Sequence, residues 1–282
     1  MMGEALAVLT ALMWAASTVL SAESLKRVDP IRSNAVKTLS SSIIMLPIAV
    51  VMGELNLSNL NVEATFFIIL AALIGFGIGD TLLYGSIILT GVSRAYTIAY
   101  TYPLFTTVIA VLFLREPFLP RYLIGTILTV LSVVLISMEE DKSYGKISLK
   151  GLLLALAAAI CWAIGTILVA VGLRGISIIL ANTIRYPIIF LFLLIISKPR
   201  MKWRISRKDL TILSASGIIG MVLGGITFLY SVKIIGASRA TPLSASSPVW
   251  AALMSSIALK EKVTARLLLS AIIVTLGIWF LI

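Results

Sequence analysis

The sequence predicts an all-α membrane protein with ten transmembrane helices in two inverted five-helix repeats around a central cavity. Three observations support this: hydrophobic residues are 60% of the 282 residues, apolar stretches recur along the chain, and the second half repeats motifs of the first. Soluble domains are about 25% charged, whereas 12% of these residues are charged. A membrane-spanning helix needs about 20 apolar residues, so ten spans occupy most of the chain.

Apolar stretches bounded by charged or turn residues give the expected spans in order. They cover residues 3–22, 32–53, 64–89, 92–114, 120–138, 149–173, 176–197, 208–234, 236–258 and 263–282. The first stretch lacks a basic segment before it and recurs later, so we expect a retained span and not a signal peptide. The longest polar interruption near the centre predicts a first repeat over 1–138, a linker over 139–148 and a second repeat over 149–282.

A comparison of the chain with itself reveals the duplication. At an offset of 148 residues, Gly3–Leu20 aligns with Gly151–Leu168 with eight of 18 positions identical, including the pair Trp14 and Trp162. At an offset of 145 the matched pairs include Gly91 and Gly236, Arg94 and Arg239, Pro103 and Pro248, and Glu116 and Glu261. Five spans is an odd number, so the two copies enter the membrane with opposite polarity, as in many secondary transporters.

Basic residues divide unequally between the loops. Sixteen lie on connections that follow the odd-numbered expected spans, five lie on the other face, and Lys37 and Arg185 lie inside spans. The positive-inside rule then places the richer face in the cytoplasm and both termini outside. The net charge of +11 therefore indicates orientation, and we expect no nucleic-acid partner.

Several classes of chemistry are disfavoured by composition. The chain has no histidine and a single cysteine, Cys161, and it lacks a phosphate-binding G-x-x-x-x-G-K-[ST] loop. We therefore expect no catalytic residues, no metal, no cofactor and no enzymatic activity. The competing classes are a membrane enzyme acting on lipid intermediates, which would need clustered carboxylates or a nucleophile with a base, and a non-transporting scaffold or receptor.

Ordered motifs across the whole chain resemble those of one family. They are Trp14–Thr18 and Trp162–Thr166 in the first span of each half, a proline in each fourth span, and the turns Arg115–Pro117 and Lys260–Lys262. This set resembles the EamA-type ten-helix members of the drug/metabolite transporter superfamily. The resemblance implies a central cavity, alternating access and substrates such as amino acids, other small metabolites or amphipathic drugs. Relatives of known structure usually have cytoplasmic termini, opposite to the charge count here.

Three charged residues lie within the expected spans away from their ends: Lys37, Asp80 and Arg185. Such groups cost about 2.5–3.5 kcal/mol at the bilayer centre and normally face a cavity or one another. We expect Asp80 to face the interior, within reach of Lys37 or Arg185. A buried ion pair that only fixes packing is an equal alternative, and Lys37 can also extend to the interface.

The aromatic candidates for the cavity wall are Trp14, Tyr84, Tyr96, Tyr100 and Trp162. The two tryptophans lie mid-span, too deep for the interfacial aromatic belt. Tyr84 shares a helical face with Asp80, and the other two tyrosines form a stripe with Pro103 and Thr107. Packing within a helix interface is an equal alternative for these aromatic residues. The prolines of the fourth spans are expected to kink their helices.

These features predict a secondary transporter in the cell membrane that moves a small organic solute by alternating access. Lys37, Asp80 and Arg185 together give a charge of +1, which favours an amino acid or organic anion. The alternatives are a multidrug or lipid-intermediate exporter of the same fold, or a non-transporting scaffold. Proton coupling would fall to Asp80, with facilitated diffusion as the other possibility. The sequence leaves the solute, the transport direction and the oligomeric state open.

Overall fold

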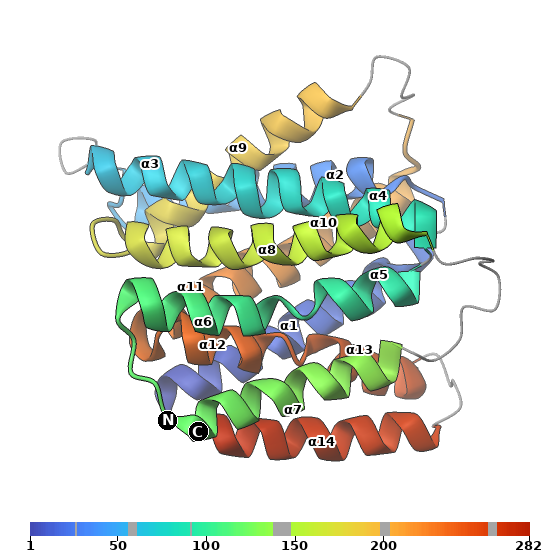
Figure 1. Cartoon of the computed structure of the whole chain (residues 1–282). Coiled ribbons are helices and arrows are strands. Elements are labelled where there is room, and N and C mark those ends of the chain that lie inside the picture. Colours follow the sequence, from blue (N-terminus) through green and yellow to red (C-terminus); the bar gives the residue numbers. More distant parts are fainter. Residues whose placement is uncertain (26, 56–60, 91, 138–147, 198–203, 259–263) are drawn as a thin grey trace.

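The computed structural model describes residues 1–25, 27–55, 61–90, 92–137, 148–197, 204–258 and 264–282, and its regular elements are all helices (Figure 1). The first part contains α1 (Met2–Leu25), α2 (Pro30–Val51), α3 (Val62–Ala71), η2 (Ala72–Gly79), α4 (Asp80–Thr90), α5 (Val92–Ala99), α6 (Tyr102–Leu114) and α7 (Pro120–Ser137). The second contains α8 (Leu149–Gly172), α9 (Ile178–Ile196), α10 (Arg207–Gly217), η3 (Ile218–Leu223), α11 (Gly224–Ile235), α12 (Ala237–Ser244), α13 (Ser247–Ala258) and α14 (Ala265–Leu281). Apart from residue 148, the expected linker 139–148 lies outside the described residues, as does the Lys260–Lys262 turn.

Within the described residues, seven helical stretches are long and apolar enough to cross a membrane. They are Met2–Leu25, Pro30–Val51, Val62–Thr90, Arg94–Leu114, Leu149–Gly172, Ile178–Ile196 and Arg207–Ile235. Large apolar side chains such as Ile43, Phe113 and Trp279 are exposed on the outer surface. A lipid-facing surface has this character, because the helix satisfies its own backbone and only apolar side chains meet the hydrocarbon. The chain is thus a multi-pass membrane protein, and the number of ten spans stays a prediction.

Short polar residues begin many of the helices. A side-chain oxygen accepts a hydrogen bond from a first-turn backbone N–H at Asp29, Asn61, Ser148, Ser177, Ser206 and Thr264. Helix starts leave such N–H groups without an intrahelical partner, and these residue types satisfy them. At the end of α11, Gly236 has φ +82°, a conformation that favours glycine and lets the chain turn directly into α12.

The fourth expected span of each half is interrupted, where the sequence predicted a kink. The helix breaks at Tyr100 and Thr101 between α5 and α6, and at Ala245 and Ser246 between α12 and α13. A proline follows each break by two or three residues, and a proline removes a backbone hydrogen bond and its ring clashes with the carbonyl four residues earlier, where α5 and α12 end. The predicted single stripe along the fourth span is therefore divided between two helices.

The first helix of each half packs closely against the third expected span of the other half. A Cβ atom at Gly79 would lie 2.8 Å from Trp162 Cδ1, and one at Gly224 would lie 2.9 Å from Trp14 Cδ1. At Gly165 a Cβ atom would lie 2.8 Å from a backbone Cα. These glycines let α8 approach η2 and α4, and let α1 approach η3 and α11, because small residues allow helix backbones to pack closely.

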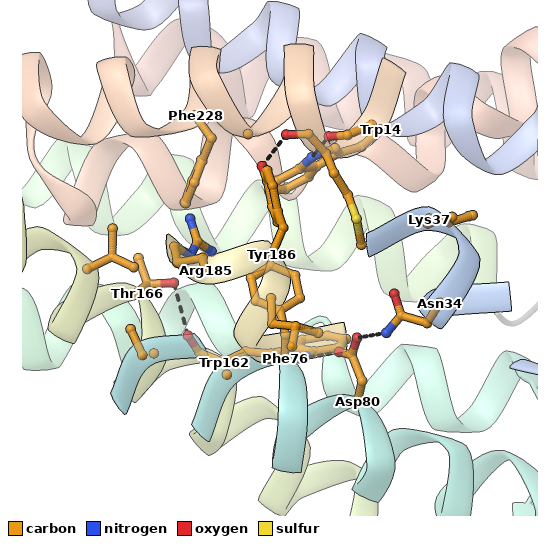
Figure 2. Close-up of a pocket in the computed structure, with 18 of the residues that line it drawn as sticks. Trp14, Asn34, Lys37, Phe76, Asp80, Trp162, Thr166, Arg185, Tyr186 and Phe228 are labelled. Atoms are coloured by element: carbon orange, nitrogen blue, oxygen red, sulfur yellow. Dashed lines mark hydrogen bonds between the residues drawn. The ribbon is translucent and has the colours of Figure 1, made fainter. Parts of the chain in front are cut away.

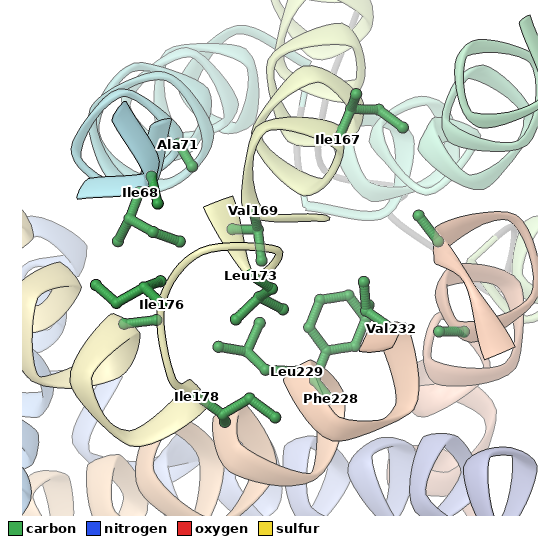
Figure 3. Packing of buried hydrophobic residues seen from close by; sticks show 14 of the residues in the cluster. Ile68, Ala71, Ile167, Val169, Leu173, Ile176, Ile178, Phe228, Leu229 and Val232 are labelled. Carbon is green, nitrogen blue, oxygen red and sulfur yellow. The ribbon is translucent and has the colours of Figure 1, made fainter. Parts of the chain in front are cut away.

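Elsewhere α2 packs along α9, and α7 along α14 near the two chain ends (Figure 1). The largest apolar cluster joins α3, α8, α9 and α11 (Figure 3). Its members Leu173 and Val232 lie one helical turn beyond Val169 and Phe228, toward the ends of α8 and α11. Because Val169 and Phe228 also line the central cavity, the cluster adjoins the cavity on the side where α8 and α11 end.

Candidate substrate cavity

A cavity of about 280 Å³ lies among α1, α2, η2, α8, α9, η3 and α11 (Figure 2). Six of the residues predicted from the sequence line it: Trp14, Lys37, Asp80, Tyr100, Trp162 and Arg185. The described structure does not include Tyr84 or Tyr96 in the lining. Tyr84 lies one turn further along α4 than Asp80, and Tyr96 packs beside Tyr100 with ring centroids 5.6 Å apart.

Asp80 is held by two neutral donors. Its Oδ1 accepts a hydrogen bond from Trp162 Nε1 at 2.9 Å, and its Oδ2 accepts one from Asn34 Nδ2 at 3.2 Å. Asp80 is the first residue of α4, directly after the π-helical segment η2. Such π-helical turns are often found at functional sites, because the extra backbone width re-aims neighbouring side chains. Helices α2, α4 and α8 therefore meet at one carboxylate.

The ion pair that was one alternative for Asp80 is not formed. Among the described residues, Asp80 makes no salt bridge to Lys37 or Arg185. Lys37 Nζ instead donates a hydrogen bond to Ser21 Oγ of α1 at 3.1 Å. Asn34, one turn earlier on α2, takes the position beside the carboxylate. The prediction overlooked this asparagine as a partner, although the offset of 148 residues aligns it with Asn182.

Arg185 is buried without a carboxylate partner. Its side chain lies on α9, the residue is 5% exposed, and its Nη1 donates a hydrogen bond to Asn182 Oδ1 at 3.2 Å. Its Cζ lies 5.2 Å from the centroid of the Phe76 ring, a cation–π arrangement. The Nε atom is buried and has no hydrogen-bond partner among the described residues. The guanidinium is therefore stabilised by an amide and a ring face, which leaves hydrogen-bonding capacity unused.

Aromatic residues form two walls of the cavity. On one wall, Trp162 meets Tyr100 and Tyr102 edge to face, with centroids 6.1 and 5.5 Å apart. On the other, Trp14 packs against Phe228 at 5.3 Å, and its Nε1 donates a hydrogen bond to the Gly220 carbonyl at 3.1 Å. Both tryptophans thus line the cavity and also pack against neighbouring helices, the two roles that the sequence analysis gave as alternatives.

Further lining residues were missed by the sequence prediction. Phe76, Tyr102, Tyr186 and Phe228 all line the cavity. The Tyr186 hydroxyl donates a hydrogen bond to the Met221 carbonyl in η3, which links α9 to the π-helical turn. A usable signal existed for Tyr186, because it follows Arg185 directly and lies on the same helical face as Asn182 and Ile189. The two phenylalanines could not be singled out from the sequence, because apolar side chains are common throughout a membrane span.

This architecture defines a class of protein. Apolar helices enclose a cavity in which one carboxylate and two cations face aromatic walls, and ionisable groups at such depth mark solute or ion pathways. Within the described chain, no three His, Cys, Asp or Glu side chains come together as a metal site. The arrangement can bind a small polar solute through charge, hydrogen bonds and aromatic contact, as a membrane transporter does.

Comparisons with known proteins identify the family. The chain matches the EamA-like transporter family over residues 1–138 and 149–282, and it belongs to that family. An uncharacterized transporter of Archaeoglobus fulgidus is 25% identical over 273 residues, covering 96% of this chain and 95% of the relative. The uncharacterized transporter YoaV of Bacillus subtilis is 24% identical over 218 residues, covering 76% and 74%.

A solved structure shares the fold. It is the crystal structure of a protein that is 17% identical in sequence, and it superposes on this chain with a TM-score of 0.82. The match covers 99% of this chain and 95% of that one. Family membership and the names of the relatives make this chain a membrane transporter, whose cargo is a small-molecule solute.

Proposed function

We propose that the protein is a secondary transporter that carries a small organic metabolite, an amino acid or an organic anion, across the cell membrane by alternating access. The observation that carries this proposal is the charge of the cavity. Lys37 and Arg185 face it with one carboxylate, Asp80, and none of the three is ion-paired with another. An uncompensated positive charge in a desolvated site attracts an anionic group strongly.

We propose that the solute contacts the six predicted residues that line the cavity, and that Tyr84 and Tyr96 support the wall from behind. The size of the cavity favours a small solute over a bulky drug or lipid intermediate. Ligand pockets usually measure about 300–1,000 Å³. At about 280 Å³ this cavity lies just below that range, which suits a metabolite of amino-acid size.

Alternating access follows from the proposed ten-span inverted repeat, with units at 1–138 and 149–282. Its structural support is the exchanged packing of Trp14 on Gly224 and Trp162 on Gly79, since the sequence comparison aligns the two tryptophans and the two glycines. In such folds one repeat rocks against the other around a fixed midplane site. The apolar cluster around Leu173 would be the seal that parts when the cavity opens to that face.

Asp80 is the proposed coupling residue if transport is driven by protons. It is the carboxylate that lines the cavity, and its two partners are neutral donors. A carboxyl in that setting can accept a proton without breaking an ion pair. Facilitated diffusion is the alternative mode, in which Asp80 only orients the solute.

Counterflow into proteoliposomes tests the function. Vesicles preloaded with one solute of a panel of amino acids, organic acids, amines and amphipathic drugs are diluted into the same labelled solute. We expect exchange for amino acids or organic acids and none for the amphipathic drugs. Exchange restricted to the drugs would support the multidrug alternative, and absence of exchange for every solute with folded protein would support the scaffold.

A further inference from the structure

One edge of the Arg185 guanidinium is free. The only hydrogen bond of this side chain in the described structure runs from Nη1 to Asn182 Oδ1 at 3.2 Å. Nε is buried and unpartnered, and Nη2 makes no hydrogen bond to any described residue. The free N–H groups therefore lie on the Nε–Nη2 side, which is one of the two forked edges of a guanidinium.

That edge has a specific chemical complement. Its two N–H groups are parallel and spaced to match the two oxygens of a carboxylate, which gives a bidentate pair of charge-assisted hydrogen bonds. A lysine at this position would offer only a point charge. Inorganic phosphate shares the anionic chemistry but is tetrahedral, so it serves as a comparison probe.

The surroundings hold the edge in position. Asn182 lies one turn before Arg185 on α9 and fixes Nη1, while the Phe76 ring of η2 covers one side of the guanidinium. In Figure 2 the nitrogen atoms of Arg185 point toward Phe228, away from the end of the cavity where Asp80 and Asn34 meet. Preorganisation of this kind reduces the ordering that a bound ligand must otherwise supply.

Other cavity groups are already engaged. Lys37 Nζ donates a hydrogen bond to Ser21, and both oxygens of Asp80 accept hydrogen bonds. Among the described residues that line the cavity, Nε of Arg185 is the one buried side-chain nitrogen or oxygen atom without a hydrogen-bond partner. Buried polar groups in folded proteins are nearly always hydrogen-bonded, so an orphaned charged donor facing a cavity indicates a missing ligand atom.

We propose that the Nε–Nη2 edge of Arg185 binds a carboxylate group of the transported solute, whose apolar part lies between Phe76 and Phe228. This assignment rests on the proposed function and deepens it, because it makes the solute a carboxylic acid. An amino group, where the solute has one, faces the Asp80 end of the cavity.

The test compares acids with their amides. Purified protein in nanodiscs is titrated with 3-phenylpropionate, 3-phenylpropionamide, leucine, leucinamide and inorganic phosphate, with thermal shift and tryptophan fluorescence as readouts. We expect each acid to bind about tenfold or more tightly than its amide, since hydrogen bonds to charged groups are the strong ones. Stronger binding of phosphate than of either acid, or equal binding of acid and amide, would overturn the assignment.

Variants then locate the effect. Arg185→Gln should abolish the preference for the acid, and Arg185→Lys should retain only part of it because the charge remains without the fork. Arg174→Gln, which removes an exposed cation outside the cavity, is the matched control and should keep the full preference. The proposal would be refuted if Lys37→Gln lost the preference for the acid over its amide while Arg185→Gln kept it. That result would assign the carboxylate to Lys37.

Failure of this assignment and failure of the proposed function give different results. Counterflow of amines or neutral solutes with no preference for acids would leave a transporter and remove the carboxylate site. Unfolding of Arg185→Gln would not end the test, because the acid–amide ratio of the unmodified protein and of Arg185→Lys still decides it.

Discussion

Trp162 Nε1 donates a hydrogen bond to Asp80 Oδ1 at 2.9 Å, whereas Trp14, the repeat partner of Trp162, donates to the backbone carbonyl of Gly220. The two tryptophans occupy matched positions in the sequence, yet only one reaches a carboxylate. The position aligned with Asp80 is Gly225, and a Cβ atom there would collide with the Tyr186 hydroxyl. The cavity therefore differs at positions that the sequence comparison aligns, which suits the proposed binding of an asymmetric solute.

Asp80→Asn should separate solute exchange from proton coupling. Asparagine has nearly the same shape and can still accept from Trp162, so the cavity should keep its form while losing its carboxylate. We expect counterflow to persist and accumulation driven by a pH gradient to disappear. Both are measured in the same proteoliposomes, and Asn34→Ala serves as a control that removes a partner of Asp80 but leaves its charge. Unchanged accumulation in Asp80→Asn would exclude it as the coupling residue.

Gly165→Ala should destabilise the protein by about 1–3 kcal/mol, the usual cost of overpacking. The added Cβ would lie 2.8 Å from the Gly75 Cα atom, and a backbone atom cannot move aside as a side chain can. Gly85→Ala is the matched control, because its Cβ would meet only the end of the Leu154 side chain at 3.3 Å. Thermal unfolding in one detergent compares the pair, and equal melting temperatures would contradict the close crossing of α8 and η2.

Much of the fold could be predicted from the sequence, because hydrophobic length and repeated rare residues are local signals. The α3–η2–α4 stretch, Val62–Thr90, matches the expected span 64–89 closely. Side-chain partners were harder to predict. An ion pair was one alternative for Asp80, but its hydrogen-bond partners are Asn34 and Trp162 from two other helices. The packing of those helices determines which donors reach the carboxylate.

Glu116→Ala should destabilise the start of α12. The carboxylate accepts hydrogen bonds from the backbone N–H groups of Ala237 and Ser238 at 2.8 and 2.9 Å, and from the Ser238 hydroxyl. Loss of an N-terminal cap costs about 0.5–2 kcal/mol. Glu63→Ala, which removes an exposed glutamate from the first turn of α3, should change stability by less, and the two melting curves are compared directly. An equal loss of stability in the two variants would contradict the capping role of Glu116.

Arg27→Gln should weaken the contact between the loop after α1 and the start of α10. Arg27 Nη2 lies 2.8 Å from Asp209 Oδ1, and the Asp209 side chain is 6% exposed. Leaving that carboxylate without its charged donor should lower stability, by less than the loss of a fully buried pair because Arg27 is half-exposed. Glu23→Gln alters the looser, exposed contact of the same arginine at 3.5 Å and should cost almost nothing. Chemical denaturation of both variants checks the ranking.

Orientation can be read from cysteine labelling of intact cells. In a Cys161→Ser background, Arg174→Cys and Arg204→Cys each introduce one thiol at an exposed position, in the turn between α8 and α9 and just before α10 respectively. Residue 174 precedes α9 and residue 204 follows it, so the two positions lie on opposite faces of the membrane. The charge count predicts that a membrane-impermeant maleimide labels residue 174 from outside and residue 204 only after permeabilisation. The reverse pattern would place both termini in the cytoplasm, and the apolar cluster around Leu173 would then seal the cytoplasmic side of the cavity instead of the external one.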